Sequence, residues 1–328
     1  MRKAALMLVL CCLLWGYSFP VMQLASKLLE GHVVANGDVA STSLHVGLDA
    51  AFLGWRFGLA ALITAACWRV ARSGFTRLEV GGGAALGVLF AAGMVCQLGG
   101  LRYTLPSVSS FITSLTVVFT PLAQALIFRR RVLARTWLGV ALALIGMTIL
   151  AQPNPGACVA CQVLPTPPLP YFGEALTVLG AVFFTALVLG LDRAGSRCNP
   201  VRMSLAMFCS SSILLMLVGA ALCGSTLYRA DVLSAIGQDQ RFIVLLVTLT
   251  FFSSVLAINL MYRYQKFVSP AVASVIYSTE SVFATLFSLA FVTEILTLKT
   301  VLGGSLILSA FFIVTLPSAE IIEAAPTP

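Results

Sequence analysis

The feature of this sequence that most limits its fold is a series of ten apolar runs, each long enough to cross a bilayer as a helix of about 20 residues. The runs lack the alternating pattern, about 10 residues per strand, that is typical of membrane β-barrels. They cover residues 4–26, 50–70, 80–101, 106–128, 134–151, 172–191, 201–223, 241–262, 269–292 and 298–317. We therefore expect an all-α polytopic membrane protein with ten transmembrane helices.

The composition excludes an ordinary soluble domain. Hydrophobic residues make up 59% of the 328-residue chain and charged residues 10%, and the mean hydropathy is +0.99. A soluble domain carries about 25% charged residues. The first run follows Arg2 and Lys3, as the core of a secretory signal would, but it is too long for one and no cleavage motif closes it. We expect this run to be the first membrane-spanning helix.

The net charge of +8 reflects orientation in a membrane rather than binding of nucleic acid. If the N-terminus is cytoplasmic, most basic residues fall in cytoplasmic loops, as the positive-inside rule requires. These residues are Arg2, Lys3, Arg69, Arg72, Arg77, Arg129, Arg130, Arg131, Arg135, Arg193, Arg197, Arg202, Arg263 and Lys266. The pattern predicts a multi-pass protein of the cytoplasmic membrane with both termini in the cytoplasm, in contact with lipid and without a nucleic-acid partner.

The second half of the sequence repeats the first. At a constant offset of 164, "LPSVSSFITSLTVVFTPL" aligns with "SPAVASVIYSTESVFATL", so that Pro106 matches Pro270 and Ser114 matches Ser278. Each half holds five apolar runs, and five is odd, so the second half enters the membrane from the opposite side. The sequence thus predicts two inverted five-helix repeats, the arrangement of many secondary transporters, which place their substrate sites between the repeats.

The repeats set the expected domain boundaries. The stretch between them, "QPNPGACVACQVLPTPPLPY", is rich in proline and predicts an extended external linker. We expect a first repeat at 1–151, this linker at 152–171, a second repeat at 172–317 and a tail at 318–328.

Several stretches, taken in order, resemble the EamA-type permeases of the drug/metabolite transporter superfamily. These are "LLWGYSFPVMQLA" with Trp15 and Gly16, "WRFGLAAL" with Arg56, and "STESVFATLFSLAFVTEILTLKTVLGG" with Glu280. The resemblance covers nearly the whole chain and implies the ten-helix, five-plus-five fold and the transport of small metabolites. The chain departs from the family pattern at Ser281, where the family has proline, and in "RRRVLAR", where it has an acidic residue.

Glu280 is the charged residue that most needs an explanation, because it lies near the middle of a predicted span. A charge there costs roughly 2.5–3.5 kcal/mol on insertion scales. At the offset of 164 its counterpart is Thr116, the centre of a predicted polar stripe. The stripe consists of Ser109, Thr113, Thr116, Thr120 and Gln124. Glu280 is either a buried, protonated carboxyl bonded to a neighbouring Ser or Thr, or a group that contacts a substrate amine or carries a proton.

Arg56 is the basic residue within a predicted span, about six residues below its outer end, or roughly 9 Å deep. Three readings are open: it snorkels outward, it pairs with Glu280, or its forked guanidinium binds a substrate carboxylate. Tyr277, Trp15 and Ser18 are further candidates for a cavity wall. Asn259 is either a polar lining group or one half of a hydrogen bond between helices.

The remaining polar features point to no cofactor and no metal. Cys158 and Cys161 lie in the predicted linker, as free thiols or as a disulfide, and one such pair lacks the second ligand pair of a zinc site. His32 and His45 are expected in the first external loop. Two small-xxx-small spacings, "GWRFG" and "GAALG", leave open whether the chain forms a homodimer.

The sequence as a whole favours a secondary transporter that moves a small metabolite, an amino acid or a related polar or amphipathic solute, by alternating access. No nucleotide-binding loop is present in the sequence, so the energy would come from a proton or counter-substrate gradient. The alternatives are a non-transporting membrane sensor or scaffold and, further off, a membrane-embedded enzyme. An enzyme would need clustered catalytic groups at membrane depth, and the predicted spans do not contain them.

Overall fold

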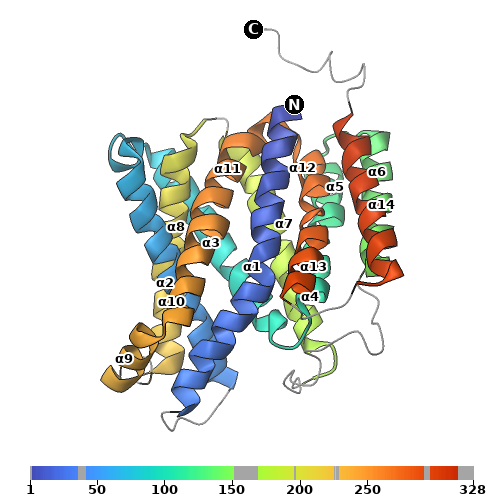
Figure 1. The fold of residues 1–328 in the computed structure, drawn as a ribbon. Helices are drawn as coiled ribbons and strands as arrows, with labels where there is room; N and C mark the ends of the chain where they lie inside the picture. The colour runs from blue at the N-terminus through green and yellow to red at the C-terminus, as the bar shows by residue number, and fades with distance from the viewer. Residues whose placement is uncertain are drawn as a thin grey trace.

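The computed structural model describes residues 2–35, 42–150, 169–195, 197–224, 226, 229–291 and 296–316, and every regular element in this part of the chain is helical. Figure 1 shows a bundle of helices whose axes run roughly along one direction. α1 begins and α14 ends at the same face of the bundle, which we call the N-face, and α9 lies at the opposite face, which we call the α9 face. The predicted linker, with Cys158 and Cys161, lies outside the described residues for most of its length, as does the tail.

Most helices follow the predicted spans, but α1 and α2 extend beyond theirs. The first half contains α1 (Arg2–Ala35), α2 (Thr42–Cys67), α3 (Arg77–Leu101), α4 (Pro106–Thr113), α5 (Thr116–Leu126) and α6 (Ala134–Leu150). The second half contains α7 (Phe172–Gly195), α8 (Pro200–Cys223), α9 (Ala230–Gln238), α10 (Gln240–Thr248), the π-helix η4 (Leu249–Leu256), α11 (Ala257–Tyr264), α12 (Pro270–Tyr277), α13 (Glu280–Ala290) and α14 (Leu298–Thr315). Two short 3₁₀ turns are η1 (Arg69–Arg72) and η5 (Gln265–Phe267).

The predicted fold class is confirmed. Within the described residues, nine spans are long and apolar enough to cross a membrane, and α6, at 17 residues, is the tenth apolar helix. Three helices begin with proline, at Pro106, Pro200 and Pro270, where its missing N–H costs no hydrogen bond. Asn199 caps α8 by accepting hydrogen bonds from the N–H groups of Val201 and Arg202.

The first external loop is shorter than predicted, and this moves both histidines. α1 continues to Ala35 because Leu29 and Val33, one turn apart, are fully buried in the bundle, and α2 already begins at Thr42. His32 and His45 therefore lie in helices, and their assignment to a loop was wrong. α9 was not predicted: it is a short amphipathic helix that buries Val232 and Ile236.

The two halves match in structure where they match in sequence. α4 ends at Thr113 and α5 begins at Thr116; α12 ends at Tyr277 and α13 begins at Glu280. Both breaks fall at positions 164 residues apart. The predicted spans 106–128 and 269–292 are therefore each divided into two half-helices. Transporters with divided helices of this kind place their half-helices at the membrane midplane.

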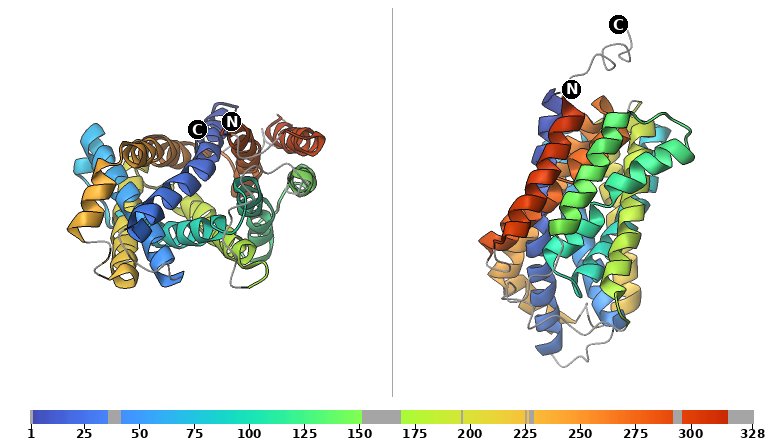
Figure 2. Two further views of the ribbon diagram at one scale, coloured as in Figure 1. Left: turned by 60° about the horizontal axis from the view of Figure 1, so that its bottom comes forward. Right: turned by 90° about the vertical axis from the view of Figure 1, so that its right-hand side faces the viewer.

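Most contacts between helices join the two halves. α2 packs chiefly on α8, α3 on α7 and α8, and α1 on α13. The pair of α6 and α14, at one side of the bundle in the left view of Figure 2, also joins the two halves. Both small-xxx-small segments face α8: a Cβ at Gly58 would lie 2.9 Å from Ser212 Oγ, and one at Gly87 would clash with Ser210 and Met207. These glycines therefore serve packing within the chain.

Candidate functional site

A cavity lies between the two repeats, near the breaks in the half-helices. It encloses about 690 Å³, counting the open space at its mouth. Its apolar walls come from Phe90 and Met94 of α3, Phe184 and Leu187 of α7, and Ile258 and Met261 of α11. Its polar groups include Arg56, Gln97, Thr113, Ser114, Thr116, Ser253 and Glu280. The cavity is mostly apolar, with two charged side chains of opposite sign.

Glu280 is the first residue of α13, and its side chain lines the cavity with 9% of the residue exposed. The first-turn position helps to offset the cost of the buried charge, because the N-terminal end of a helix favours an anion. Within the part of the chain that the structure describes, no group hydrogen bonds to its carboxylate and no cation pairs with it. The expected bond to a neighbouring Ser or Thr is therefore not found there.

Arg56 also lines the cavity, and it is deeper than the sequence indicated. α2 begins at Thr42 rather than near residue 50, so Arg56 lies near the middle of a 26-residue helix. It is 2% exposed, which rules out snorkelling. Its Nε donates to Ser254 Oγ at 2.8 Å, one terminal nitrogen donates to Ser253 Oγ at 2.9 Å, and the other is 3.1 Å from Met22 Sδ.

The two serines come from a π-helix. Ser253 and Ser254 are neighbours in η4, and both turn their hydroxyls to the same guanidinium. Short π-helical segments occur frequently at functional sites. The serines hold Arg56 without neutralising it, and no carboxylate in the described residues lies within ion-pair distance of it. Arg56 and Glu280 are thus not paired with each other, and both side chains line the same cavity.

Two aromatic side chains close part of the wall. Trp15 and Tyr277 have ring centroids 5.6 Å apart, and Trp15 Nε1 donates to the carbonyl of Ser253 at 3.2 Å. Tyr277 donates its hydroxyl to Gln265 Oε1 at 2.8 Å, and Gln265 in turn donates to the carbonyl of Val188 at 2.8 Å. This chain of hydrogen bonds links α12, η5 and α7.

The polar stripe is only partly a cavity surface. Thr113 and Thr116 line the cavity, and Thr113 accepts a hydrogen bond from Gln97 at 2.9 Å. Ser18 lines it too, but its hydroxyl donates to the carbonyl of Trp15. Thr120, one turn further along α5, does not line the cavity, and its hydroxyl is buried without a hydrogen-bond partner among the described residues.

Asn259 does not belong to the cavity either. Its side chain accepts a hydrogen bond from Ser204 of α8 at 2.8 Å and donates to the carbonyl of Val255 at 2.7 Å. It joins two helices, one of the two readings that the sequence left open. No group of three or more His, Cys, Asp or Glu in the described residues could hold a metal ion.

Sequence reasoning missed Ser253 and Ser254, the partners of Arg56. A pair of adjacent serines inside the apolar run 241–262 was the available signal. Gln97, a polar group for which a hydrogen bond between helices was the favoured interpretation, donates to Thr113 of α4 across the turn that follows α3, and this partner was not predicted.

The fold and the cavity together define a multi-pass membrane protein built from two helical repeats around a central site, which is the architecture of secondary transporters. The sequence matches the EamA-like transporter family over residues 2–152 and 171–316. The chain therefore belongs to the EamA-like transporter family and is a membrane transporter by family.

A curated relative agrees with this assignment, and a solved structure shares the fold. An uncharacterized transporter of Archaeoglobus fulgidus is 28% identical over 318 residues, which is 95% of this chain and 86% of the relative. A crystal structure superimposes with a TM-score of 0.60 over 96% of this chain and 97% of the other, at 16% sequence identity. At that identity the similarity shows the fold alone.

Proposed function

We propose that this protein is a secondary carrier that moves small amphipathic solutes, amino acids and related zwitterions, across the cytoplasmic membrane by alternating access. The observation that carries the proposal is that one basic and one acidic side chain, Arg56 and Glu280, are buried in one cavity without pairing with each other. A buried charge without a partner is costly, and a ligand that supplies the opposite charge removes that cost.

Arg56 is suited to bind a carboxylate. A guanidinium has five N–H donors in a planar fork, and Ser253, Ser254 and Met22 occupy three of them. Two donors are left without a partner among the described residues. They can bind one carboxylate in the two-pronged geometry that arginine favours.

Glu280 is suited to bind an amine or to exchange a proton. Its carboxylate opens to the cavity from the start of α13, and the pseudo-equivalent Thr116 offers a hydroxyl from the start of α5. A carboxylate can balance a substrate ammonium group. In the absence of substrate, the same carboxyl can accept the proton that drives the opposite half of a transport cycle.

The apolar walls favour solutes with a bulky apolar part. Phe90, Phe184, Met94 and Met261 surround the charged groups, and methionine side chains adapt to ligands of different shape. Basic residues predominate in the loops of the N-face, so we place this face in the cytoplasm and the α9 face outside. A sensor or scaffold would have no need of two unpaired charges at the midplane.

The test is a thermal-stability screen of the purified protein against amino acids, organic amines and organic acids. A ligand at about 100 times its Kd stabilises the folded form by about 2.7 kcal/mol. We expect zwitterions with large apolar side chains to raise the melting temperature of the wild type and of Glu174→Gln, a control on the α9-face end of α7. We expect no such rise in Glu280→Gln. Equal stabilisation of Glu280→Gln would remove this residue from the binding site.

A further inference from the structure

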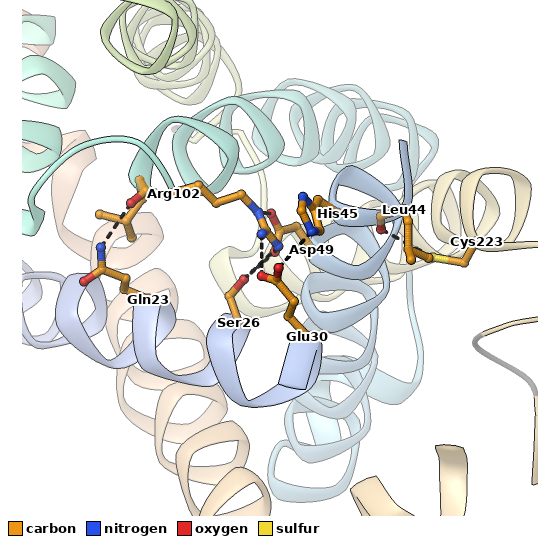
Figure 3. A network of polar contacts seen from close by, with 9 residues as sticks. Gln23, Ser26, Glu30, Leu44, His45, Asp49, Arg102 and Cys223 are labelled. Atoms are coloured by element: carbon orange, nitrogen blue, oxygen red, sulfur yellow. Dashed lines mark hydrogen bonds and ion pairs between the residues drawn. The ribbon is translucent and has the colours of Figure 1, made fainter. Parts of the chain in front are cut away.

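A second group of charged side chains, separate from the central cavity, joins three helices at the α9 face (Figure 3). Arg102, which follows α3, donates from Nε to Asp49 Oδ2 at 2.8 Å and from a terminal nitrogen to Glu30 Oε2 at 2.7 Å. Ser26 donates to Asp49 Oδ1 at 2.6 Å. His45 Nε2 lies 2.8 Å from Glu30 Oε1. We call Ser26, Glu30, His45, Asp49 and Arg102 the outer clasp.

A second histidine pair holds the same end of α1 from the other side. His32 Nε2 lies 2.8 Å from Asp239 Oδ2, and Asp239 caps α10 by accepting from the N–H groups of Arg241 and Phe242. Glu30 and His32 are two residues apart on α1. The last turns of this helix are therefore tied to α2 through His45 and to the start of α10 through Asp239.

The charges of the outer clasp balance only when His45 carries a proton. Glu30 and Asp49 bring two negative charges and Arg102 one positive charge. Burial alone would lower the pKa of Arg102, but Asp49 and Glu30 outweigh it and hold this pKa above its ordinary value. Arg102 thus stays charged, and an imidazolium at His45 supplies the missing positive charge.

The His32 pair follows the same logic. The hydrogen bond with His32 holds the pKa of Asp239 below its ordinary value, and the N–H groups at the start of α10 act in the same direction. Asp239 is therefore a carboxylate near neutral pH, and its Oδ2 faces the His32 ring. Solvent reaches both rings, because the His32 and His45 side chains are 27% and 18% exposed.

No other charged side chain described on the surrounding helices supplies a positive charge to Glu30 or Asp239. Arg229 and Asp231 of the α9 region pair with each other at 2.6 Å. Lys27 of α1 and Arg241 of α10 are exposed. α8 contributes the uncharged Cys223, whose Sγ lies 3.8 Å from the carbonyl of Leu44. The sequence contains two histidines in all, and both are at this face.

We infer that His32 and His45 form an external proton-binding site that regulates the opening of the α9 face. Bound protons hold the end of α1 against α2 and α10, and their loss loosens it. α1 also carries Gln23, which donates to the carbonyl of Leu101, and farther along it Ser18 and Trp15 of the cavity wall. For its role in transport, the inference rests on the proposed function; the pH-dependent clasp itself does not.

The sign of the effect follows from the histidine chemistry. An imidazolium attracts the neighbouring carboxylate and a neutral imidazole does not, so acid favours the closed arrangement and a rise in pH weakens it. Acid outside the cell should therefore keep the α9 face closed. Alkaline conditions should allow it to open more often.

The experiment is hydrogen exchange of the full chain in lipid nanodiscs at about pH 5.5 and about pH 8, with rates corrected for the intrinsic pH dependence. We expect protection of amides in the last two turns of α1 and the first two turns of α2 to fall about tenfold at the higher pH. The same fall should occur in Glu280→Gln, which removes the cavity carboxyl. It should shrink below about twofold in the His32→Gln, His45→Gln double variant.

The outcomes separate this inference from the proposed function, because the exchange experiment needs no substrate. Protection that is independent of pH in the wild type and in Glu280→Gln would overturn the proton site, even if transport is found. An equal fall in the double histidine variant would overturn it too. A pH-dependent clasp in a protein that transports nothing would support the proton site and reject the carrier.

Discussion

Replacing Arg56 with lysine should weaken solute binding by about 10- to 100-fold, although the positive charge is kept. Lysine is a single ammonium on a flexible chain and cannot reach Ser253 and Ser254 while it also presents a fork to a carboxylate. Each hydrogen bond to a charged group contributes about 1.5–3 kcal/mol, and about 1.4 kcal/mol corresponds to a factor of ten. The measurement is the Kd of the stabilising solute for wild type, Arg56→Lys and, as a control at an exposed position, Arg241→Lys.

The Arg56→Met variant separates binding from stability. Arg56 is a buried cation whose described partners are neutral, so its replacement by an apolar side chain of similar length removes a desolvation cost. We expect Arg56→Met to bind no zwitterion and yet to melt at the same temperature as the wild type or higher. A variant that melts well below the wild type would show that Arg56 is a structural residue.

Introducing even one methyl group at Gly16 should destabilise the bundle strongly. A Cβ there would lie 2.6 Å from Phe283 Cβ, 2.7 Å from the Ala284 backbone nitrogen and 2.8 Å from the Phe283 carbonyl carbon. Two of these are backbone atoms of α13, which cannot rotate away. α1 would be forced off the half-helix that begins with Glu280. Overpacking of this kind costs about 1–3 kcal/mol, and more for a larger side chain.

The matched control for Gly16→Ala lies on the same helix. A Cβ at Gly31 would meet no atom within 4 Å, and alanine favours the helical state over glycine by about 1 kcal/mol. We expect Gly31→Ala to melt at or above the wild-type temperature and Gly16→Ala several degrees below it. Equal melting temperatures would contradict the close packing of α1 on α13.

The fold could be predicted from the sequence because its main determinants are local. Run length alone predicts a membrane-spanning helix, and the offset of 164 relates Pro106 to Pro270 and Thr113 to Tyr277 without any knowledge of contacts. The C-terminal end of α1 and the N-terminal end of α2 were harder to predict from the sequence. Lys27, Glu30 and His32 interrupt the apolar pattern of "KLLEGHVVA", and the continuation of the helix depends on the burial of Leu29 and Val33 by other helices.

The site was less accessible to sequence reasoning, because its geometry depends on departures from regular helix. Nothing in "SSFITSLTVV" marks the break after Thr113, since the segment has neither glycine nor proline at that point. The sequence also gives no indication of the π-helix that brings Ser253 and Ser254 to Arg56. Thr120 lies one turn beyond Thr116 in α5 and does not line the cavity, so the predicted stripe is longer than the cavity surface.

The outer clasp was missed for a related reason. Asp49 lay just before the run 50–70 and Arg102 just after the run 80–101, so both were assigned to loops or left unassigned. In the structure their side chains are 2% and 9% exposed. The boundary residues of membrane helices thus carry much of the polar chemistry that hydropathy does not detect.

The most direct test of the central account is solute counterflow in proteoliposomes, with wild type, Glu280→Gln and Glu174→Gln reconstituted at equal amounts. Vesicles preloaded with an unlabelled amphipathic amino acid should take up the labelled compound through the wild type and through Glu174→Gln. Uptake through Glu280→Gln should fall to the level of empty vesicles. Counterflow by Glu280→Gln equal to that of the wild type, or none by the wild type for any solute that stabilises it, would contradict a carrier that works through this cavity.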